Sequence, residues 1–353
     1  MKELLTRTEC TAMKGIAILG IMLHNYCHYV KDIVRENEFT WQQSKCDRLW
    51  EVLQQPDDLL PMHLLSFFGH YGVTVFLFLS GFGLVMKYER SPLPEVGIWR
   101  FIRYNYLKLF RIFIVGFVLF TMLDAITPGM HHYKTHEVVA MLGMYANFLE
   151  HPARVVWPGP YWYFSVTLQL YILYRLVFYR WRHWGIVVAL IVGCWAWQMC
   201  YLDDMVTLER LRYSLVGGLL PFGMGVLVAR WSVSKQFSLL SPLSSLLIFV
   251  LMVVFGFMFS VFDINTWLWV PALAVVGTIA LVKLIPQSVM PSIVWLGTVS
   301  AAIFVMHPLV RKIFVRPYYV YDQYAGLFLF IVATLLVSWL VKIIIDKIPK
   351  PTL

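Results

Sequence analysis

Long apolar runs, separated by short polar or charged segments, dominate this sequence. Each run is close to the roughly 20 residues that an α-helix needs to cross the hydrocarbon layer of a bilayer. Since backbone amides find no partner in lipid, segments of this kind are helical. The pattern predicts an all-α, polytopic membrane protein with about ten transmembrane helices. Their approximate ranges are 12–30, 67–86, 110–127, 161–179, 184–201, 213–230, 240–261, 264–285, 290–310 and 323–345.

The composition excludes a soluble protein. Hydrophobic residues make up 59% of the chain and charged residues 14%, against about 45–50% and 25% in soluble domains. Ten spans leave almost nothing of the 353 residues for a separate soluble domain, so we expect residues 1–353 to form a single transmembrane domain. The first run lacks a small-residue cleavage site and contains His24 and Asn25, which indicates a retained span rather than a signal peptide.

The distribution of charge predicts the orientation in the membrane. With the N-terminus in the cytoplasm, the inner segments are 1–14, 87–111, 175–183, 230–239, 283–289 and 342–353, and they contain 18 of the 29 Lys and Arg residues. Lys and Arg concentrate on the cytoplasmic side of membrane proteins. We therefore expect both termini to be cytoplasmic. The net charge of +9 then belongs to a basic inner face, and we expect no nucleic-acid partner.

The largest inner cluster of basic residues is interleaved with aromatic residues and has two interpretations. It can determine topology and contact anionic lipids. Alternatively, it can hold a cytoplasmic polyphosphate, since Arg is suited to bidentate phosphate contacts. Composition leaves both open. The cluster consists of Lys87, Arg90, Arg100, Arg103, Lys108 and Arg111.

His24 is the first candidate for chemistry. It follows Lys14 by ten residues, so it lies roughly 15 Å along the first helix, near the membrane midplane. Ionisable groups at this depth are costly and mark functional sites, although a structural histidine bonded to a neighbouring helix is the alternative. A neutral histidine can accept a hydroxyl proton as a general base. Asn25 either orients His24 or bonds to another helix. His28, one turn later, makes only a weak metal site with His24, and we expect no metal.

Ser80 lies in the second span about seven residues from its cytoplasmic end, which puts it at a depth similar to that of His24. Two glycines follow it. Gly81 and Gly83 either permit close helix approach or leave room for an acyl chain.

Three later spans also contain polar residues. Trp162 stands where interface anchors are common, whereas Gln169 and Tyr171 lie deeper in the same span. Ser300 is in the middle of the ninth span. His307, which precedes a proline near the outer end of that span, either caps a helix end or contacts substrate.

Five of these elements together resemble the integral-membrane acyltransferase family three. They are the stretch from Lys14 to His24, the run F-L-F-L-S-G-F (76–82), L-K-L-F-R-I-F (107–113), Y-W-Y-F-S-V-T-L-Q-L-Y (161–171) and G-T-V-S-A-A-I-F-V-M-H-P (297–308). Members of this family move acetyl or other acyl groups from acyl-coenzyme A to sugars, polysaccharides or lipid-linked glycans. The resemblance covers most of the chain, without the C-terminal esterase-like domain of many relatives.

The resemblance implies a role for each candidate residue. His24 becomes the general base of a membrane O-acyltransferase. No cofactor is bound permanently; acyl-CoA is a co-substrate, a glycan or lipid-linked glycan is the acceptor, and the protein lies in the bacterial inner membrane, as a monomer or a homodimer. The expected donor-binding residues are Lys14, Ser80, Arg103, Lys108 and Arg111, and the expected substrate-binding residues are Asn25, His28, Trp162, Gln169, Tyr171, Ser300 and His307.

The competing function is transport, as a flippase for lipid-linked sugars or an exporter of polysaccharide. A proton-coupled carrier should bury a carboxylate. Every Asp and Glu here can be assigned to a loop or to the end of a span, which argues against coupled transport but not against a flippase.

Overall fold

The computed structural model describes residues 4–90, 95–231, 241–318 and 322–353, and in these ranges it contains helices and no strands. Residue 240, where the seventh predicted span begins, and most of the predicted inner segment 230–239 lie outside the described residues. The α-helices are α1 (Arg7–Cys27), α2 (Gln43–Gln54), α3 (Leu60–Phe68), α4 (Gly72–Tyr88), α5 (Ile98–Ile126), α6 (Thr135–Leu142), α7 (Pro152–Val155), α8 (Trp162–Leu173), α9 (Trp184–Met199), α10 (Met205–Arg212), α11 (Leu215–Trp231), α12 (Pro242–Phe262), α13 (Ile264–Trp267), α14 (Val270–Leu284), α15 (Met290–Tyr318) and α16 (Gln323–Lys347). Single turns of 3₁₀-helix are η1 (Gly69–Tyr71), η2 (Ala146–Phe148) and η3 (Gly159–Tyr161), and η4 (Tyr174–Phe178) is a π-helical turn.

Every predicted span overlaps an apolar helix, but not every helix has full membrane-spanning length. Among the described residues, five helices are long and apolar enough to cross a membrane: Leu60–Tyr88, Ile98–Ile126, Pro242–Phe262, Met290–Phe314 and Gln323–Lys347. The bent pair α10 and α11 makes a sixth if it is one span, while α9 and α14 are apolar but shorter. The polytopic helical fold is confirmed; ten full spans and cytoplasmic termini remain predictions.

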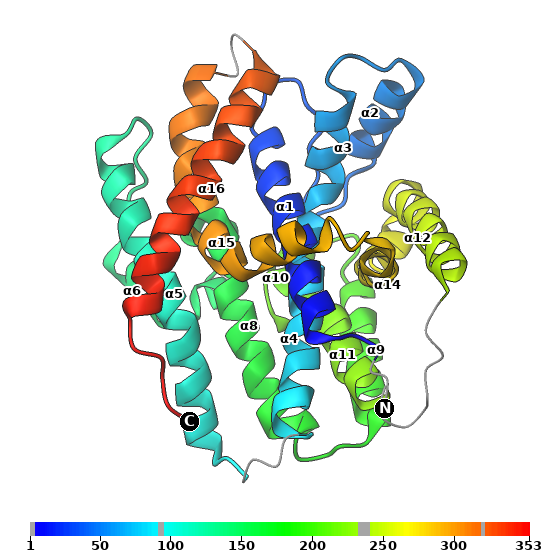
Figure 1. Cartoon of the computed structure of the whole chain (residues 1–353), viewed down its shortest axis with the longest axis vertical. Helices are drawn as coiled ribbons and strands as arrows, with labels where there is room; N and C mark the ends of the chain where they lie inside the picture. The colour runs from blue at the N-terminus through cyan, green and yellow to red at the C-terminus, as the bar shows by residue number, and fades with distance from the viewer. Residues whose placement is uncertain (1–3, 91–94, 232–240, 319–321) are drawn as a thin grey trace.

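α1 lies at the centre of the bundle, against α15, α4 and α3 (Figure 1). Small residues allow the close crossings. A methyl group on Gly297 of α15 would collide with the carbonyl oxygen of Thr11 in α1, and one on Gly81 of α4 would collide with the carbonyl oxygen of Phe222 in α11. In a membrane, where lipid is as apolar as Leu, such backbone contact is a main source of helix association. Gly81 therefore has the packing role that the sequence suggested.

The spans predicted at 12–30 and 67–86 leave residues 31–66 as a loop on the predicted outer side, and the structure differs from this expectation. α3 begins at Leu60 and continues through η1 into α4, so the second span starts earlier than predicted. Part of the preceding stretch packs inward: Val34, Glu36 and Phe39 are buried, and Glu36 is only 2% exposed, whereas most of α2 remains at the surface. It thereby brings a carboxylate into contact with the helical core.

For His307, one of the two expected roles, the cap of a helix end, is wrong. α15 runs without interruption from Met290 to Tyr318, so His307 does not cap a helix end. Its Nδ1 lies 3.0 Å from the carbonyl oxygen of Ile303, one turn earlier in the same helix. The following proline is accommodated inside this long, packed helix rather than ending it.

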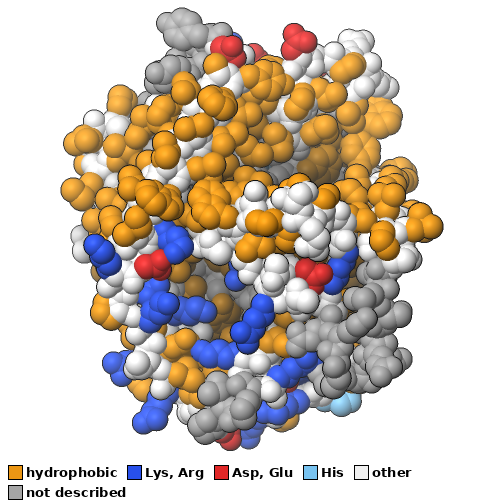
Figure 2. Space-filling model, viewed as in Figure 1, with side chains coloured by type: hydrophobic (Ala, Val, Ile, Leu, Met, Phe, Trp, Pro, Cys, Tyr) orange, Lys and Arg blue, Asp and Glu red, His pale blue; other side chains and the backbone are white. Residues whose placement is uncertain are grey.

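The surface separates basic from apolar side chains. Figure 2 shows Lys and Arg side chains gathered in the lower half of one face, around a hollow and below a broad hydrophobic band. The C-terminus lies in the same half of the molecule (Figure 1). This separation agrees with a basic inner face.

Candidate active site

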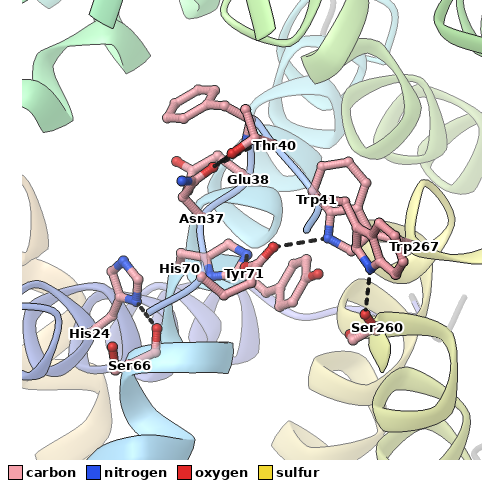
Figure 3. A network of polar contacts seen from close by, with 12 residues as sticks. His24, Asn37, Glu38, Thr40, Trp41, Ser66, His70, Tyr71, Ser260 and Trp267 are labelled. Atoms are coloured by element: carbon pink, nitrogen blue, oxygen red, sulfur yellow. Dashed lines mark hydrogen bonds and ion pairs between the residues drawn. The ribbon is translucent and has the colours of Figure 1, made fainter. Parts of the chain in front are cut away.

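His24 is held by a close approach of α1 to η1. A methyl group on Gly69 would lie 2.5 Å from the carbonyl oxygen of Gly20 and 2.8 Å from Cβ of His24, so only glycine fits there. The approach puts His24 Nδ1 2.9 Å from the carbonyl oxygen of Ser66 (Figure 3). A carbonyl only accepts, so Nδ1 carries the hydrogen and Nε2 of the neutral ring keeps its lone pair. This tautomer is the one a general base needs.

Two further histidines surround His24. Its ring centroid is 5.1 Å from that of His28 and 5.3 Å from that of His70. His70 Nε2 lies 3.0 Å from Oε2 of Glu36, and the indole of Trp267 donates to Oε1 of Glu36 at 3.1 Å. Burial raises the pKa of Glu36 well above its usual value. Glu36 and His70 thus form a buried acid–imidazole pair beside His24.

The sequence analysis missed this pair. Glu36 belongs to an acidic stretch that was assigned to an external loop, and His70 was not singled out. The available signal was the spacing of His63 and His70, which are seven residues apart and so lie on one face of the helical segment that begins at Leu60.

These histidines line a cavity of 210 Å³, which we call the outer cavity after the predicted orientation of the chain. Four predicted residues line it together: His24, Asn25, His28 and Trp162. Asn25 donates to the carbonyl oxygen of Ile21 and accepts from Nη1 of Arg311 at 2.9 Å, so it bonds to another helix, as one of the two expectations had it. Further lining residues are Tyr29, Asn37, Glu38, Phe39, His70, Tyr213, Phe304 and Arg311.

An inner cavity of 330 Å³ contains another set of predicted residues: Lys14, Ser80, Lys108, Tyr171 and Ser300. Lys87 joins them, with its ammonium 3.0 Å from the hydroxyl of Tyr104. Gly83 also lines this cavity, and a methyl group there would meet nothing within 4 Å. Of the two glycines, Gly83 is the one that leaves space. Three lysines around one cavity suit an anionic ligand.

Phe304 lines both cavities. Its ring centroid lies 5.2 Å from that of Tyr163, 5.7 Å from that of Phe164 and 6.0 Å from that of His307. Phe304 is thus the ring shared by the lysine-rich and histidine-rich cavities, and we call it, with the rings packed against it, the aromatic layer.

Four predicted residues line neither cavity. Arg103 is exposed, and Arg111 donates to the carbonyl oxygen of Ile348 at 3.1 Å, next to the C-terminal segment. Gln169 donates to Asn147 at 2.9 Å and accepts from the backbone amide of Leu215 at 3.1 Å, which ties α8 to the start of α11. His307 is fully buried, and its Nε2 has no hydrogen-bond partner among the described residues.

A third cavity of 600 Å³ lies between α1, α4, α12 and α14. Its lining is almost entirely apolar, so it suits hydrocarbon rather than the reacting groups. In the described part of the chain, no group of three His, Cys, Asp or Glu side chains is placed to hold a metal ion.

Comparison with known proteins gives one match. The family model described as an acyltransferase domain matches residues 9–343, which is nearly the whole chain. No curated protein matches the sequence, and no solved structure matches the fold. The match spans both cavities and all the helices that line them.

Proposed function

This chain belongs to acyltransferase family three, and from that premise we propose that it is a membrane O-acyltransferase using cytoplasmic acyl-CoA. An acetyl or other short acyl group passes to a hydroxyl of a sugar, polysaccharide or lipid-linked glycan. The observation that carries the proposal is the arrangement of His24. Its free Nε2 belongs to an outer cavity that one aromatic layer separates from a cavity lined by three lysines.

The inner cavity suits the donor. Coenzyme A carries phosphates, and Lys14, Lys87 and Lys108 place ammonium groups around this cavity. The pantetheine arm then extends past Ser80 and Ser300 towards Phe304, which brings the thioester to the layer between the two cavities.

The outer cavity suits the acceptor. His24 Nε2 takes the proton of the acceptor hydroxyl while the hydroxyl oxygen attacks the thioester carbonyl carbon. The new carbon–oxygen bond replaces the carbon–sulfur bond, and the leaving thiolate takes the proton from His24. Ser80 shares the inner cavity with Tyr163 and Tyr171, and among the described residues no histidine or carboxylate lines that cavity to act as its base. Direct transfer is therefore favoured over an acyl-serine intermediate.

The test is acyl transfer by purified protein in lipid nanodiscs. Labelled acetyl-CoA is supplied with sugar and lipid-linked acceptors, and His24→Gln is compared with His63→Gln. His63 is an equally buried histidine whose Nδ1 accepts from the backbone amide of Val34. We expect His24→Gln to lower the rate of transfer by about 10²- to 10⁴-fold while acyl-CoA still binds, and His63→Gln to retain most of the rate. Equal rates for His24→Gln and wild type would contradict the assignment.

One observation favours the alternative, a lipid-linked sugar flippase or polysaccharide exporter. Glu36 lies in a loop and Asp124 lies at the end of a span, as expected, but both side chains are buried in the bundle. Asp124 is paired with Lys312, whereas Glu36 faces His70. The argument from a lack of buried carboxylates therefore no longer holds. The two functions separate in the same assay, because a transporter neither binds acyl-CoA nor consumes it.

A further inference from the structure

Arg311 is a buried arginine of the outer cavity that has no carboxylate partner among the described residues. It lies on α15 one turn after His307 and is only 8% exposed. Its guanidinium group donates to Oδ1 of Asn25 at 2.9 Å and stacks 3.9 Å from the ring centre of Tyr29. Both partners are neutral. Among the described residues, no carboxylate lies within salt-bridge distance of Arg311.

Two other cations of the bundle pair with carboxylates, whereas the buried Arg212 donates to Oε1 of Gln198 and to a backbone carbonyl. Arg230 donates to both carboxylate oxygens of Glu89, the closer one at 2.7 Å. Lys312, the residue after Arg311, pairs with Asp124. A buried charge without a counter-charge is costly unless a ligand supplies one. Arg311 thus differs from Arg230 and Lys312 in facing the outer cavity in place of a carboxylate.

The remaining ionisable groups of the cavity do not supply that counter-charge. His24, His28 and His70 are neutral or cationic, never anionic. Glu38 is the one carboxyl group among the lining residues. Its nearby polar groups are Arg212 and the indole of Trp162, and burial raises its pKa to about 7. Glu38 forms no ion pair with Arg311 among the described residues, and Arg212 donates to its backbone carbonyl rather than to its carboxylate.

The rest of the lining fits a sugar unit. The 210 Å³ volume equals about seven waters at liquid density, which is the scale of one monosaccharide rather than an oligosaccharide. Phe39 stacks on Tyr213 with ring centroids 3.7 Å apart and meets Trp162 edge-on at 5.1 Å. Aromatic faces of this kind can cover the apolar face of a sugar ring, while Asn37 offers polar contacts at the rim.

We propose that the acceptor unit carries an oxyanion, either a carboxylate or a phosphate, which binds Arg311 while a hydroxyl of the same unit lies at His24. This inference rests on the proposed acyl transfer and names the class of its acceptor. Arginine is suited to both oxyanions, because its planar fork matches their paired oxygens. The stacking on Tyr29 and the bond to Asn25 hold the guanidinium in place before the ligand arrives.

The test compares charged and neutral probes built on the same sugar ring. Purified protein in nanodiscs is given labelled acetyl-CoA with methyl glucoside, methyl glucuronide, the neutral methyl ester of that glucuronide, or glucose 1-phosphate. We expect the charged probes to have a KM at least about 10-fold lower than the neutral ones. Preference for the glucuronide identifies a carboxylate acceptor, and preference for the sugar phosphate identifies a phosphate acceptor. Equal KM values for charged and neutral probes overturn the inference.

Two variants test whether Arg311 causes the preference for charged acceptor probes. Arg311→Gln should raise the KM for the preferred anion by about 10- to 100-fold with less effect on the neutral probes, and Arg311→Lys should lie between Gln and wild type. If the Gln variant does not fold, thermal stabilisation of wild type and Arg311→Lys by each probe gives the same comparison. No stabilisation by either anion, or equal stabilisation by the neutral probes, overturns the inference.

The failure of acyl transfer itself is recognised separately. Acyl-CoA binding and its slow hydrolysis are measured without any acceptor. If neither occurs, the proposed function is wrong and the inference falls with it. If both occur but charge does not affect acceptor use, only the inference about Arg311 is wrong.

Discussion

At the scale of single residues, the role that a polar side chain can have depends on its surroundings. His24 and His307 are both buried histidines with Nδ1 bonded to a carbonyl oxygen. The neutral tautomer is therefore the same in both, with the lone pair on Nε2. His24 lines a cavity and His307 does not, so the two residues differ in access rather than in intrinsic chemistry.

The first prediction concerns Glu38 and pH. Burial raises its pKa from 4.5 to about 7, so between these values the folded state binds more protons than the unfolded state. Stability contributed by the neutral carboxyl is then present below pH 4.5 and lost as the pH rises through 7. Glu38→Gln should weaken the fall in thermal midpoint between pH 5 and pH 8. Glu150→Gln, at an exposed position, serves as the control, and unchanged pH dependence in Glu38→Gln would show that burial does not govern this group.

The second prediction concerns Phe304. Because its ring lies between the two cavities, Phe304→Ala should let water reach the thioester. We expect a several-fold rise in acyl-CoA hydrolysis without acceptor and a lower fraction of label transferred to acceptor. Phe328→Ala removes a ring that is 66% exposed and should change neither quantity. If hydrolysis in Phe304→Ala stays at the wild-type rate, this ring is not the barrier.

At the scale of helices, close backbone approach determines the geometry of the site. The backbone of α1 approaches α15 closely at Gly297 and η1 closely at Gly69. The backbone of α4 approaches α11 closely at Gly81. Two of these crossings involve the helix that carries His24. The position of His24, the proposed base, is therefore set by helix contacts that need no side chain at the glycine positions.

The third prediction uses the pair Gly81 and Gly83 on α4. A side chain at Gly81 would collide with the backbone of α11, whereas one at Gly83 would enter the inner cavity. Gly81→Leu should lower the yield of monodisperse, folded protein. Gly83→Leu should fold normally but weaken acyl-CoA binding by about 10-fold or more, since it fills space meant for the pantetheine arm. Size-exclusion chromatography and a donor-binding titration separate the two effects, and unchanged donor affinity in Gly83→Leu would place the donor elsewhere.

At the scale of the whole molecule, the surface divides into apolar and basic regions. Large apolar side chains are exposed along α12 and α16, which is expected of helices that face lipid. The inner cavity, with its three lysines, gathers basic groups contributed by α1, α4 and α5. The predicted orientation and the proposed donor site thus depend on the same lysine residues.

The fourth prediction tests this orientation. Cys200 follows α9 and is exposed, and the other cysteines are buried or partly buried. With the N-terminus in the cytoplasm, Cys200 faces the outside and should react with a membrane-impermeant maleimide in intact cells. Arg103→Cys, made in a Cys200→Ser background, should react only after the cells are permeabilised. The opposite pattern would invert the topology and move the lysine-lined cavity to the outer side.

The sequence by itself determined the class of protein, the location of the apolar helices and the candidacy of His24. These follow from the length of apolar runs and from the cost of a polar group within them, and both are local properties. The resemblance to the acyltransferase family grouped Lys14, Ser80, Arg103, Lys108 and Arg111 as donor residues. The first, second and fourth of these share one cavity, and the two arginines lie outside it.

Only the tertiary structure decided which polar residues meet. Glu36, His70 and Arg311 come from a loop, a 3₁₀ turn and a late helix, so no periodicity links them, and glycine-mediated helix crossings bring them around His24. It also showed that Gly81 packs against a helix whereas Gly83 has open space beside it, and that Gln169 bonds to Asn147 instead of lining a cavity. The physical reason is that an apolar run specifies a helix, whereas the neighbours of each face depend on how all the helices pack.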